Sequence, residues 1–291
     1  MKILFVINPK SGKTEENNLE DLIEKQAEIS GFEYELYHMH GGNFIKEISK
    51  KIYSYKPQIV AAAGGDGTIN LLAALLENTK TALLIIPNGS ANGMAKELNI
   101  KNIPSAIKLI EDGVYKSIDL LRINNRVCIH LADVGLNARI VKRFEDDPKR
   151  GLAIYAKHML AEIFLVKKYR FLIKCGKDEY IRKAVSLTFA NASKYGTGAV
   201  INPTGIIDDG KMELIIIKPF PTIKWFGIAW KMFSKTLETS EYVEVIQCTK
   251  AHITSKTSTT LQVDGEIIGK VKTIDAEILH KALTIIVPAG N

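Results

Sequence analysis

Residues 58–76, QIVAAAGGDGTINLLAALL, consist of two apolar runs on either side of a glycine-rich segment. The first run is short and ends at a turn signal, which is typical of a buried strand, whereas the second has the spacing of a helix. Glycines at such a junction allow the backbone to approach a ligand closely, and the positive end of the helix favours an anion. The segment therefore predicts a strand, a loop suited to phosphate and a helix.

Strand and helix patterns alternate over about the first 113 residues. Strand patterns lie at 2–7, 32–39, 58–63 and 81–87, and helical patterns lie at 17–29, 43–55, 68–78, 90–100 and 103–113. This alternation predicts a parallel sheet with helices on its faces, and such sheets bind ligands at the carboxyl ends of their strands. Three loops, NPKSGKT, GGDGTIN and PNGSANG, each follow a strand, so we expect them to form one crevice. Ser90 is expected to cap the helix that begins there.

The pattern changes at about residue 120, where short strand-like segments separated by turn signals begin. They lie at 117–123, 126–136, 170–176, 179–193, 210–219, 242–250, 251–256, 259–270, 273–280 and 282–288. Helical patterns interrupt them at 151–170 and 222–237. The fold class predicted is therefore a Rossmann-like α/β domain followed by an antiparallel β domain, most simply a β-sandwich.

The bulk properties exclude several classes of protein. No run approaches the roughly 18 apolar residues that suggest a spanning helix. The three cysteines, Cys128, Cys175 and Cys248, are far apart and odd in number, so neither a disulfide framework nor a metal knuckle is indicated, and a reducing compartment is expected. A formal net charge of +7 is a mild bias towards anionic partners such as nucleotides, nucleic acid or anionic lipid, or simply a well-solvated surface.

Two familiar phosphate-binding motifs are not met. The segment NPKSGKT lacks a Walker loop's first glycine, because Ile7 occupies that position, and GDGTIN has Asn70 where a dinucleotide fingerprint has its third glycine. Asp66 lies in the middle of this anion-binding loop. It is either a turn residue, an acidic residue at a helix N-terminus, or a ligand of a divalent cation that accompanies phosphate.

The motifs NPKSG, GGDGTIN, PNGSANGMAKEL, SIDL, NPTGIIDDGKMEL and VDGE occur in the order found in the diacylglycerol kinase catalytic family. The resemblance spans nearly the whole chain and includes bacterial lipid kinases, sphingosine kinases and ceramide kinases. The GGDGT core alone is also similar to NAD kinases and phosphofructokinases, whereas DDGKMEL and VDGE favour the lipid kinases. The resemblance implies an NAD-kinase-like nucleotide domain at 1–121, completed by about 282–291, and a β-sandwich lipid-substrate domain at 122–281.

The resemblance also implies roles for individual residues, with ATP as the nucleotide. The residues expected to bind it are Asn8, Pro9, Lys10, Ser11, Gly12, Gly64, Gly65, Asp66, Gly67, Thr68, Ile69, Asn70, Leu71 and Ser90. Ser90 stands where the family usually has threonine. Asp66 would be the carboxylate for the nucleotide's Mg²⁺, Asp119 an acid that supports the site, and Glu266 the general base. The VDGE segment can equally be a plain hairpin with an Asp-Gly turn.

A structural Mg²⁺ site is implied for the segment GIIDDGK. Its ligands would be Asp209 and backbone oxygens near Ile206 and Lys211, with Asp208 in the same network. One departure concerns Gly93, which stands where the family usually has an aspartate of the acid and metal network. His38 and His40 could suggest another metal, but no further ligand cluster is evident.

A lipid hydroxyl requires contact with a membrane surface. The segment 222–237 combines Trp225, Phe226, Trp230 and Phe233 with three lysines, which suits either an interfacial helix or a helix packed on the β domain. We expect a cytoplasmic lipid kinase of phospholipid biosynthesis, peripheral at the inner membrane face, with diacylglycerol as the default substrate and no nucleic-acid partner; a homodimer is left open. The alternatives are an NAD kinase-like metabolite kinase and a catalytically weak lipid-binding regulatory protein.

Overall fold

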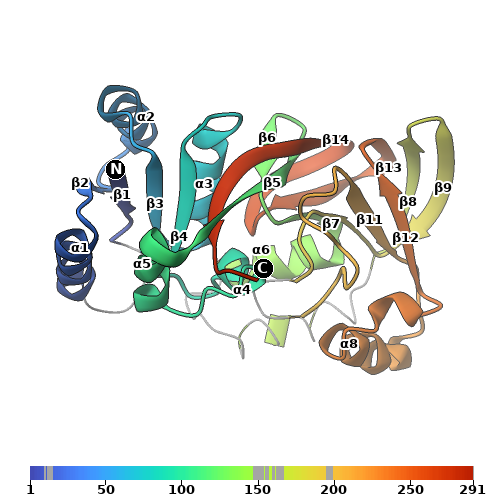
Figure 1. Ribbon diagram of the computed structural model, residues 1–291. Helices are drawn as coiled ribbons and strands as arrows, with labels where there is room; N and C mark the ends of the chain where they lie inside the picture. The colour runs from blue at the N-terminus through green and yellow to red at the C-terminus, as the bar shows by residue number, and fades with distance from the viewer. Residues whose placement is uncertain are drawn as a thin grey trace. The chain divides into compact units, whose positions relative to one another are not determined.

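The computed structural model describes residues 1–9, 11, 16–146, 154, 157–158, 161, 167–194 and 199–290. The chain divides into two compact units (Figure 1). The first comprises Met1–Ile118 and Lys281–Asn291, and the second comprises Asp119–His280. Most of the helix expected at 151–170 lies outside the described residues, as do Lys10 and Gly12 of the expected nucleotide loop.

The first unit is built on a parallel sheet. Its strands are β1 (Lys2–Ile7), β2 (Glu33–His38), β3 (Ile59–Gly64) and β4 (Ala82–Pro87), in the order β4-β3-β1-β2. The end of β14 (Glu266–Val287) joins β4 in parallel through Ile285 and Leu83. The helices are α1 (Glu16–Ser30), α2 (Phe44–Tyr55), α3 (Asp66–Leu76), α4 (Gly93–Glu97) and α5 (Ile103–Asp112). The predicted alternation is thus confirmed.

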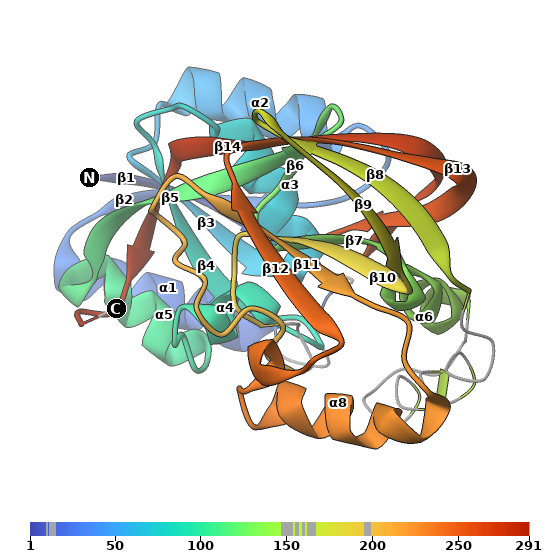
Figure 2. The ribbon, with the colours of Figure 1, turned by 90° about the vertical axis from the view of Figure 1, so that its right-hand side faces the viewer.

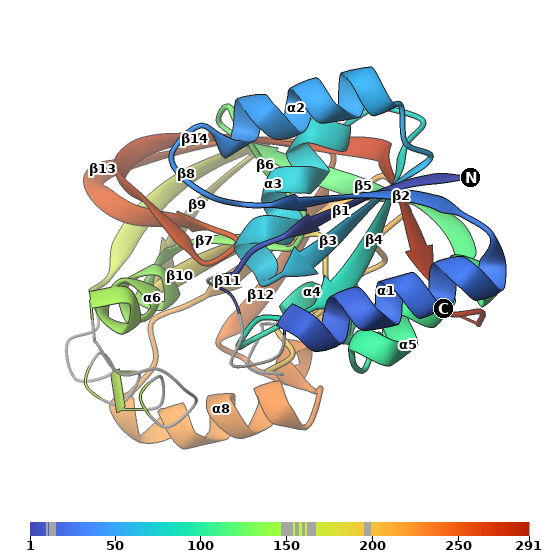
Figure 3. The same ribbon diagram turned by 90° about the vertical axis from the view of Figure 1, so that its left-hand side faces the viewer.

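Helices cover both faces of this sheet (Figure 3). Helices α2 and α3 lie on one face, and α1 packs with α5 on the other, as right-handed crossovers require when the chain moves from β1 out to β2 and back to β3. Strand β3 is consequently buried along its whole length, which explains its uninterrupted apolar sequence.

The second unit is an antiparallel β-sandwich (Figure 2). The strand order is β12-β11-β10-β7-β13-β14, with β8 also paired to β13, β9 to β8, and β5 to both β14 and β6. Strand β5 (Val114–Ile123), like β14, runs from one unit into the other. The other strands are β6 (Arg126–Cys128), β7 (Leu131–Gly135), β8 (Tyr169–Cys175), β9 (Asp178–Ala184), β10 (Ser186–Ala190), β11 (Met212–Ile217), β12 (Val243–Cys248) and β13 (Lys250–Val263). The helices are α6 (Leu136–Asp146), η1 (Thr222–Lys224), α8 (Trp225–Phe233) and η2 (Leu237–Thr239).

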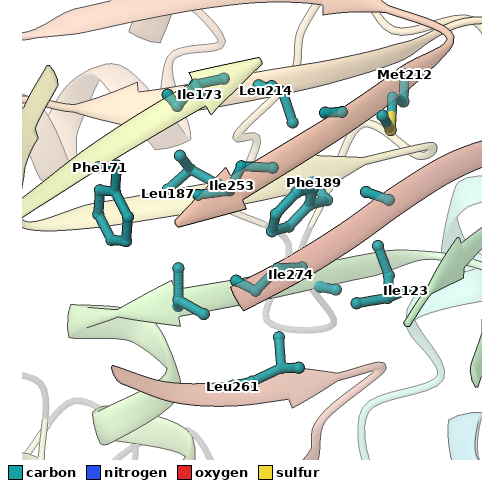
Figure 4. Packing of buried hydrophobic residues seen from close by; sticks show 14 of the residues in the cluster. Ile123, Phe171, Ile173, Leu187, Phe189, Met212, Leu214, Ile253, Leu261 and Ile274 are labelled. Carbon is teal, nitrogen blue, oxygen red and sulfur yellow. The ribbon is translucent and has the colours of Figure 1, made fainter. Parts of the chain in front are cut away.

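Apolar side chains from the strands of the sandwich fill its interior (Figure 4). Phe171 of β8, Phe189 of β10 and Ile253 of β13 belong to one cluster, and each is at most 1% exposed. Burial alternates along β8, as expected for an antiparallel strand with one face towards the core.

Two of the differences from the sequence prediction concern β14 and α6. Strand β14 is a single strand of 22 residues, where three strands were expected. The turn signals at Gly269 and Lys281 are positions with positive φ inside it, and not loops between strands. Helix α6 was not predicted, because the apolar pattern at 126–136 reads as one strand that continues to Leu136.

Candidate functional site

Two loops of the first unit meet where the strand order reverses. After β1 the chain passes to β2, on one side of β1, and then to β3, on the other side, so the loops that leave β1 and β3 are neighbours. The Asn8 amide donates to Ala63 O at 2.9 Å, and Asn8 Nδ2 donates to Thr68 Oγ1 at 3.0 Å. Ser11 Oγ donates to Asn8 O at 2.8 Å. A switch point of this kind is where open α/β sheets bind their ligands.

The third loop, which follows β4, approaches the second through a pair of glycines. A Cβ atom on Gly89 would lie only 2.4 Å from the Gly65 Cα, so neither backbone could approach so closely if Gly89 had a side chain. Asn92 fixes the turn, because its Oδ1 accepts from Gly89 N and its Nδ2 donates to Gly89 O, both at 2.8 Å. The three predicted loops therefore converge within the first unit.

Asp66 is the first residue of α3 and binds the start of another helix. Its Oδ2 accepts from Gly93 N at 3.0 Å, and its Oδ1 accepts from Met94 N at 3.1 Å. The carboxylate thus satisfies the first amides of α4, which an N-cap side chain usually does. The expectation that Ser90 caps this helix is wrong, because the helix begins at Gly93 and Asp66 supplies its cap.

The other residues of the predicted phosphate loop differ in what they can offer a ligand. The amides of Thr68 and Ile69 both donate to Gly65 O, so the amides of Asp66 and Gly67 precede these first helical bonds. The side chain of Ile69 is fully buried in the core and is available only through its backbone. Asn70 Oδ1 is buried, and no donor in the described part of the chain lies within hydrogen-bonding distance of it. This orphan acceptor and the glycine pair fit a nucleotide.

In the second unit, Asp119 lies on β5 and is fully buried. Its Oδ2 accepts from Gly210 N at 2.6 Å, and its Oδ1 lies 2.9 Å from His280 Nδ1. The Asp119 amide donates to Ile207 O at 2.7 Å, and its carbonyl accepts from Asn191 Nδ2 at 2.8 Å. Asp119 therefore holds the loop that precedes β11 from two sides.

That loop contains the predicted metal ligands. Asp209 is exposed, and its Oδ1 accepts from Lys211 N at 3.0 Å, which closes the turn. Asp208 is partly buried, and Ile206 is exposed. Among the described residues no group of three or more His, Cys, Asp or Glu side chains could hold a metal, so backbone oxygens would have to complete any ligand set here.

The VDGE segment forms the turn between β13 and β14. Asp264 and Gly265 both have positive φ, as a two-residue hairpin turn requires. The Asp264 carboxylate accepts from three successive amides, those of Ile129, His130 and Leu131, at 2.9 to 3.1 Å. Burial raises the pKa of Asp264 in spite of these donors. Glu266 is exposed, and the described residues include no hydrogen-bond or ion-pair partner for it.

Sequence reasoning missed a buried polar network behind this turn. Asp133, fully buried on β7, accepts from Asn137 Nδ2 at 2.7 Å, from Thr188 Oγ1 at 3.3 Å and from Gln262 Nε2. Gln262 Oε1 in turn accepts from Gly265 N at 2.7 Å. A carboxylate in the apolar run HLADVGL was the available signal. The network connects the centre of the sandwich to the residue next to Glu266.

Helix α8 presents two different faces. Trp225 and Ile228 are buried, and Trp225 packs on Leu136 and Ile140 of α6. Phe226, Trp230 and Phe233, at helical spacing on another face, are 69%, 73% and 60% exposed. The alternative of a helix packed on the β domain thus holds for the buried face, and the interfacial alternative stays a prediction for the exposed face. In the described portion of the chain, no helix combines the length and the hydropathy needed to cross a bilayer.

Two family models match the chain. The diacylglycerol kinase catalytic domain matches residues 2–123, and the YegS C-terminal NAD kinase beta sandwich-like domain matches residues 131–287. A probable lipid kinase YegS-like protein of Klebsiella pneumoniae is 30% identical over 239 residues, 79% of this chain and 78% of that protein. Its counterpart in Chromohalobacter salexigens is 26% identical over 80% of this chain and 76% of its own length.

Solved structures agree on the fold. The crystal structure of a diacylglycerol kinase from Bacillus anthracis strain Sterne has a TM-score of 0.78 at 20% identity and covers 99% of this chain and 97% of its own. Another structure from that organism has a TM-score of 0.82 at 22% identity, with the same coverage. This similarity confirms the α/β domain and the β-sandwich that the sequence predicted.

Proposed function

The chain belongs to the lipid kinases of the diacylglycerol kinase catalytic family, and from this premise we propose that it transfers the γ-phosphoryl group of ATP to the free hydroxyl of diacylglycerol. The single observation that best supports the nucleotide half of this proposal is the convergence of three loops at the switch point of the first unit. The glycine pair brings the second and third loops together, and the N-terminus of α3 favours the charge of a phosphate group.

In this proposal, the described residues of the first unit contact ATP in different ways. The amides of Asp66 and Gly67 donate to phosphate oxygens, and the orphan Oδ1 of Asn70 accepts a hydrogen bond from a ligand hydroxyl or amino group. Pro9 and Ser90 lie in the loops that follow β1 and β4, and Leu71 lies in α3. A carboxylate has about four acceptor positions, so Asp66 can bind a cation while it caps α4.

Mg²⁺ would be held by Asp66 and, as a second and structural ion, by Asp209 with backbone oxygens near Ile206 and Lys211. Asp208 would support that second set. When bound, Mg²⁺ neutralises charge that develops on the phosphate oxygens. Asp119 contributes by fixing the loop through Gly210 and Ile207, so we assign it a positioning role.

Glu266 is the proposed general base. The lipid oxygen forms a bond to the γ-phosphorus while the bond from that phosphorus to the bridging oxygen of ADP breaks, and the hydroxyl proton passes to the Glu266 carboxylate. Glu266 suits this role because it is exposed, whereas its neighbour Asp264 is occupied by three amides. The Asp133–Gln262 network holds the turn that orients Glu266.

The test is transfer of label from γ-labelled ATP with Mg²⁺ to separate panels of lipids and NAD. We expect label in diacylglycerol, and loss of transfer in Glu266→Gln and Asp66→Asn. Glu179→Gln and Asp112→Asn, which make the same changes at exposed carboxylates, should retain wild-type rates.

The outcomes separate the alternatives. Label in NADP would replace the proposal with a metabolite kinase, and ATP binding without transfer to any acceptor would indicate a regulatory protein. Label in another lipid would correct only the acceptor. An active Glu266→Gln variant would refute the base, provided that circular dichroism shows both variants folded.

A lipid acceptor implies contact with a membrane, and we assign this contact to the exposed face of α8. Lys224, Lys231 and Lys235 accompany its aromatic side chains, a composition that suits an anionic interface. Together with free cysteines, this composition favours a cytoplasmic enzyme that binds the inner membrane face.

In a Trp225→Phe variant, the fluorescence emission of Trp230 should shift to shorter wavelength when anionic vesicles are added. Vesicle binding should fall in Trp230→Ser and remain in Tyr53→Ser, a control at an 81% exposed residue of α2; equal binding would contradict the assignment.

A further inference from the structure

A cavity of about 640 Å³ lies in the second unit, and none of its lining residues has a role in the transfer proposed above. Four segments form its walls: helix α6, the start of β8 with the two residues before it, a segment of β13, and β14. The lining residues are Arg139, Lys142, Arg143, Lys167, Lys168, Tyr169, Thr257, Ser258, Thr260 and Lys270. Lys270 lies four residues beyond Glu266 on β14, about 13 Å at the usual rise of a strand.

Six of the ten lining residues are cationic, and no Asp or Glu is among the described residues that line the cavity. Arg139, Lys142 and Arg143 are spaced so that they share one face of α6, while Leu136 and Ile140 of the same helix are buried. Six cationic side chains around one cavity favour an anion with several oxygens. Arginine and lysine donors to phosphate oxygens also form the stronger, charge-assisted class of hydrogen bond.

The strand that forms the third wall is irregular at the cavity. Thr254 pairs with Thr273, but the next pair given by the register is Thr259 with Val271, so four residues of β13 lie opposite one residue of β14. Thr257 and Ser258 belong to this bulge, and both are exposed. Bulges release backbone groups from a ladder and redirect side chains. The hydroxyls here add neutral donors beside the cations.

Helix α6, which forms one wall of the cavity, also packs on α8. Trp225, the first residue of α8, packs on Leu136 and Ile140 of α6, and α6 supplies three of the six cations. Figure 2 shows α6 and α8 on the same side of the sandwich.

We propose that this cavity is a binding site for a phosphate group, separate from the site of phosphoryl transfer. The group can belong to the headgroup of an anionic membrane lipid or to a soluble phosphate compound, since both present the same oxygens to the cations. The proposal does not depend on the transfer reaction, because the site would bind its ligand whether or not ATP is consumed.

The test compares two double variants with the same change in net charge. Lys142→Gln/Lys270→Gln removes two exposed cations from opposite walls of the cavity, and Lys46→Gln/Lys50→Gln removes two exposed cations from α2. All measurements use the full chain without ATP, and circular dichroism and thermal unfolding establish that each variant is folded. In one arm, sedimentation measures binding to phosphatidylcholine vesicles with and without phosphatidic acid. In the other, calorimetry measures binding of inorganic phosphate and glycerol 3-phosphate.

A lysine near an anionic surface strengthens binding about fivefold, so the cavity variant should bind phosphatidic acid vesicles about 25-fold more weakly than the α2 variant. If the loss appears only with vesicles, the ligand is a lipid headgroup. If it also appears with the soluble phosphates, a free phosphate compound binds there. Equal affinities of the two variants in both arms would overturn the proposal. That result would leave the assignment of kinase activity unaffected.

Discussion

Asp119 and His280, the first and last residues of the second unit, contact each other through Oδ1 and Nδ1 at 2.9 Å. They lie on β5 and β14, the two strands that also enter the first unit. The other oxygen of Asp119 accepts from Gly210 N, so one buried carboxylate joins both crossing strands to the loop proposed to bind a metal. Its contribution can be measured separately from catalysis.

Asp119→Asn should lower the free energy of unfolding by about 2 kcal/mol, because an amide offers one acceptor oxygen where the buried carboxylate uses one oxygen for Gly210 N and the other for His280 Nδ1. Urea unfolding followed by circular dichroism measures this change. Asp275→Asn is the control, since it alters an exposed Asp-His pair, His252 with Asp275 at 2.6 Å, and should cost less than about 0.5 kcal/mol. Equal costs would show that burial of Asp119 is energetically unimportant.

Gly89→Ala should weaken ATP binding, because the new Cβ would lie 2.4 Å from Gly65 Cα and force the two loops apart. Fluorescent-nucleotide titration measures the affinity. Gly227→Ala makes the same change on α8, where a Cβ meets nothing within 4 Å. That control should bind ATP normally and gain about 0.5–1 kcal/mol in stability, because alanine favours a helix. Normal ATP affinity in folded Gly89→Ala would argue against a nucleotide at this loop pair.

Gln262→Leu should reduce kcat by up to about 100-fold with little change in KM for ATP, because the turn that orients Glu266 loses its link to Asp133. Steady-state kinetics separates the two parameters. Gln247→Leu removes a similar hydrogen bond, from Nε2 to Glu213 at 3.0 Å, away from the turn. It should lower stability and leave kcat unchanged; a parallel loss of kcat in both variants would indicate a general structural effect.

Glu244 should give stability a defined pH dependence. Its hydrogen bonds with Arg182 lower the pKa of Glu244 in the folded protein, so this contribution is complete above the unfolded pKa and is lost as pH falls through the folded pKa. Glu244→Gln should therefore cost about 1 kcal/mol at pH 7, and the difference from the wild type should vanish in acid. Urea unfolding at several pH values tests this, with Glu179→Gln in the exposed pair with Lys174 as control. A cost that is independent of pH would contradict it.

The first unit could be predicted from the sequence for a simple physical reason. Strands β1, β3 and β4 are buried on both faces and the helices on one, so continuous apolar runs alternate with helical stripes. The loops of the candidate site follow those strands directly, which made Asn8, Asp66 and Gly89 predictable neighbours. That Asp66 caps α4 was not predictable, because the contact depends on the position at which that helix starts.

The contacts of the second unit were harder to predict from the sequence, because they join segments that are far apart in the chain. In the sequence, Asp133 is an isolated acid in an apolar strand. Its partner Gln262 lies 129 residues later and is brought opposite it by the pairing of β7 with β13. The amides that bind Asp264 interrupt the strand expected at 126–136, and nothing in those residues encodes their acceptor. Helix α6 begins at Leu136, which also continues the preceding strand pattern.

The path of β14 has a consequence for biosynthesis. Its end pairs with β4 through Ile285 and Leu83, although Met1–Ile118 emerges from the ribosome before the entire second unit. The amino-terminal sheet therefore stays incomplete at one edge until about 160 further residues have been translated, roughly 10–30 s at the usual rates of elongation. During that interval the backbone groups at the edge of β4 have no partner strand, and such an edge is prone to pair with other chains.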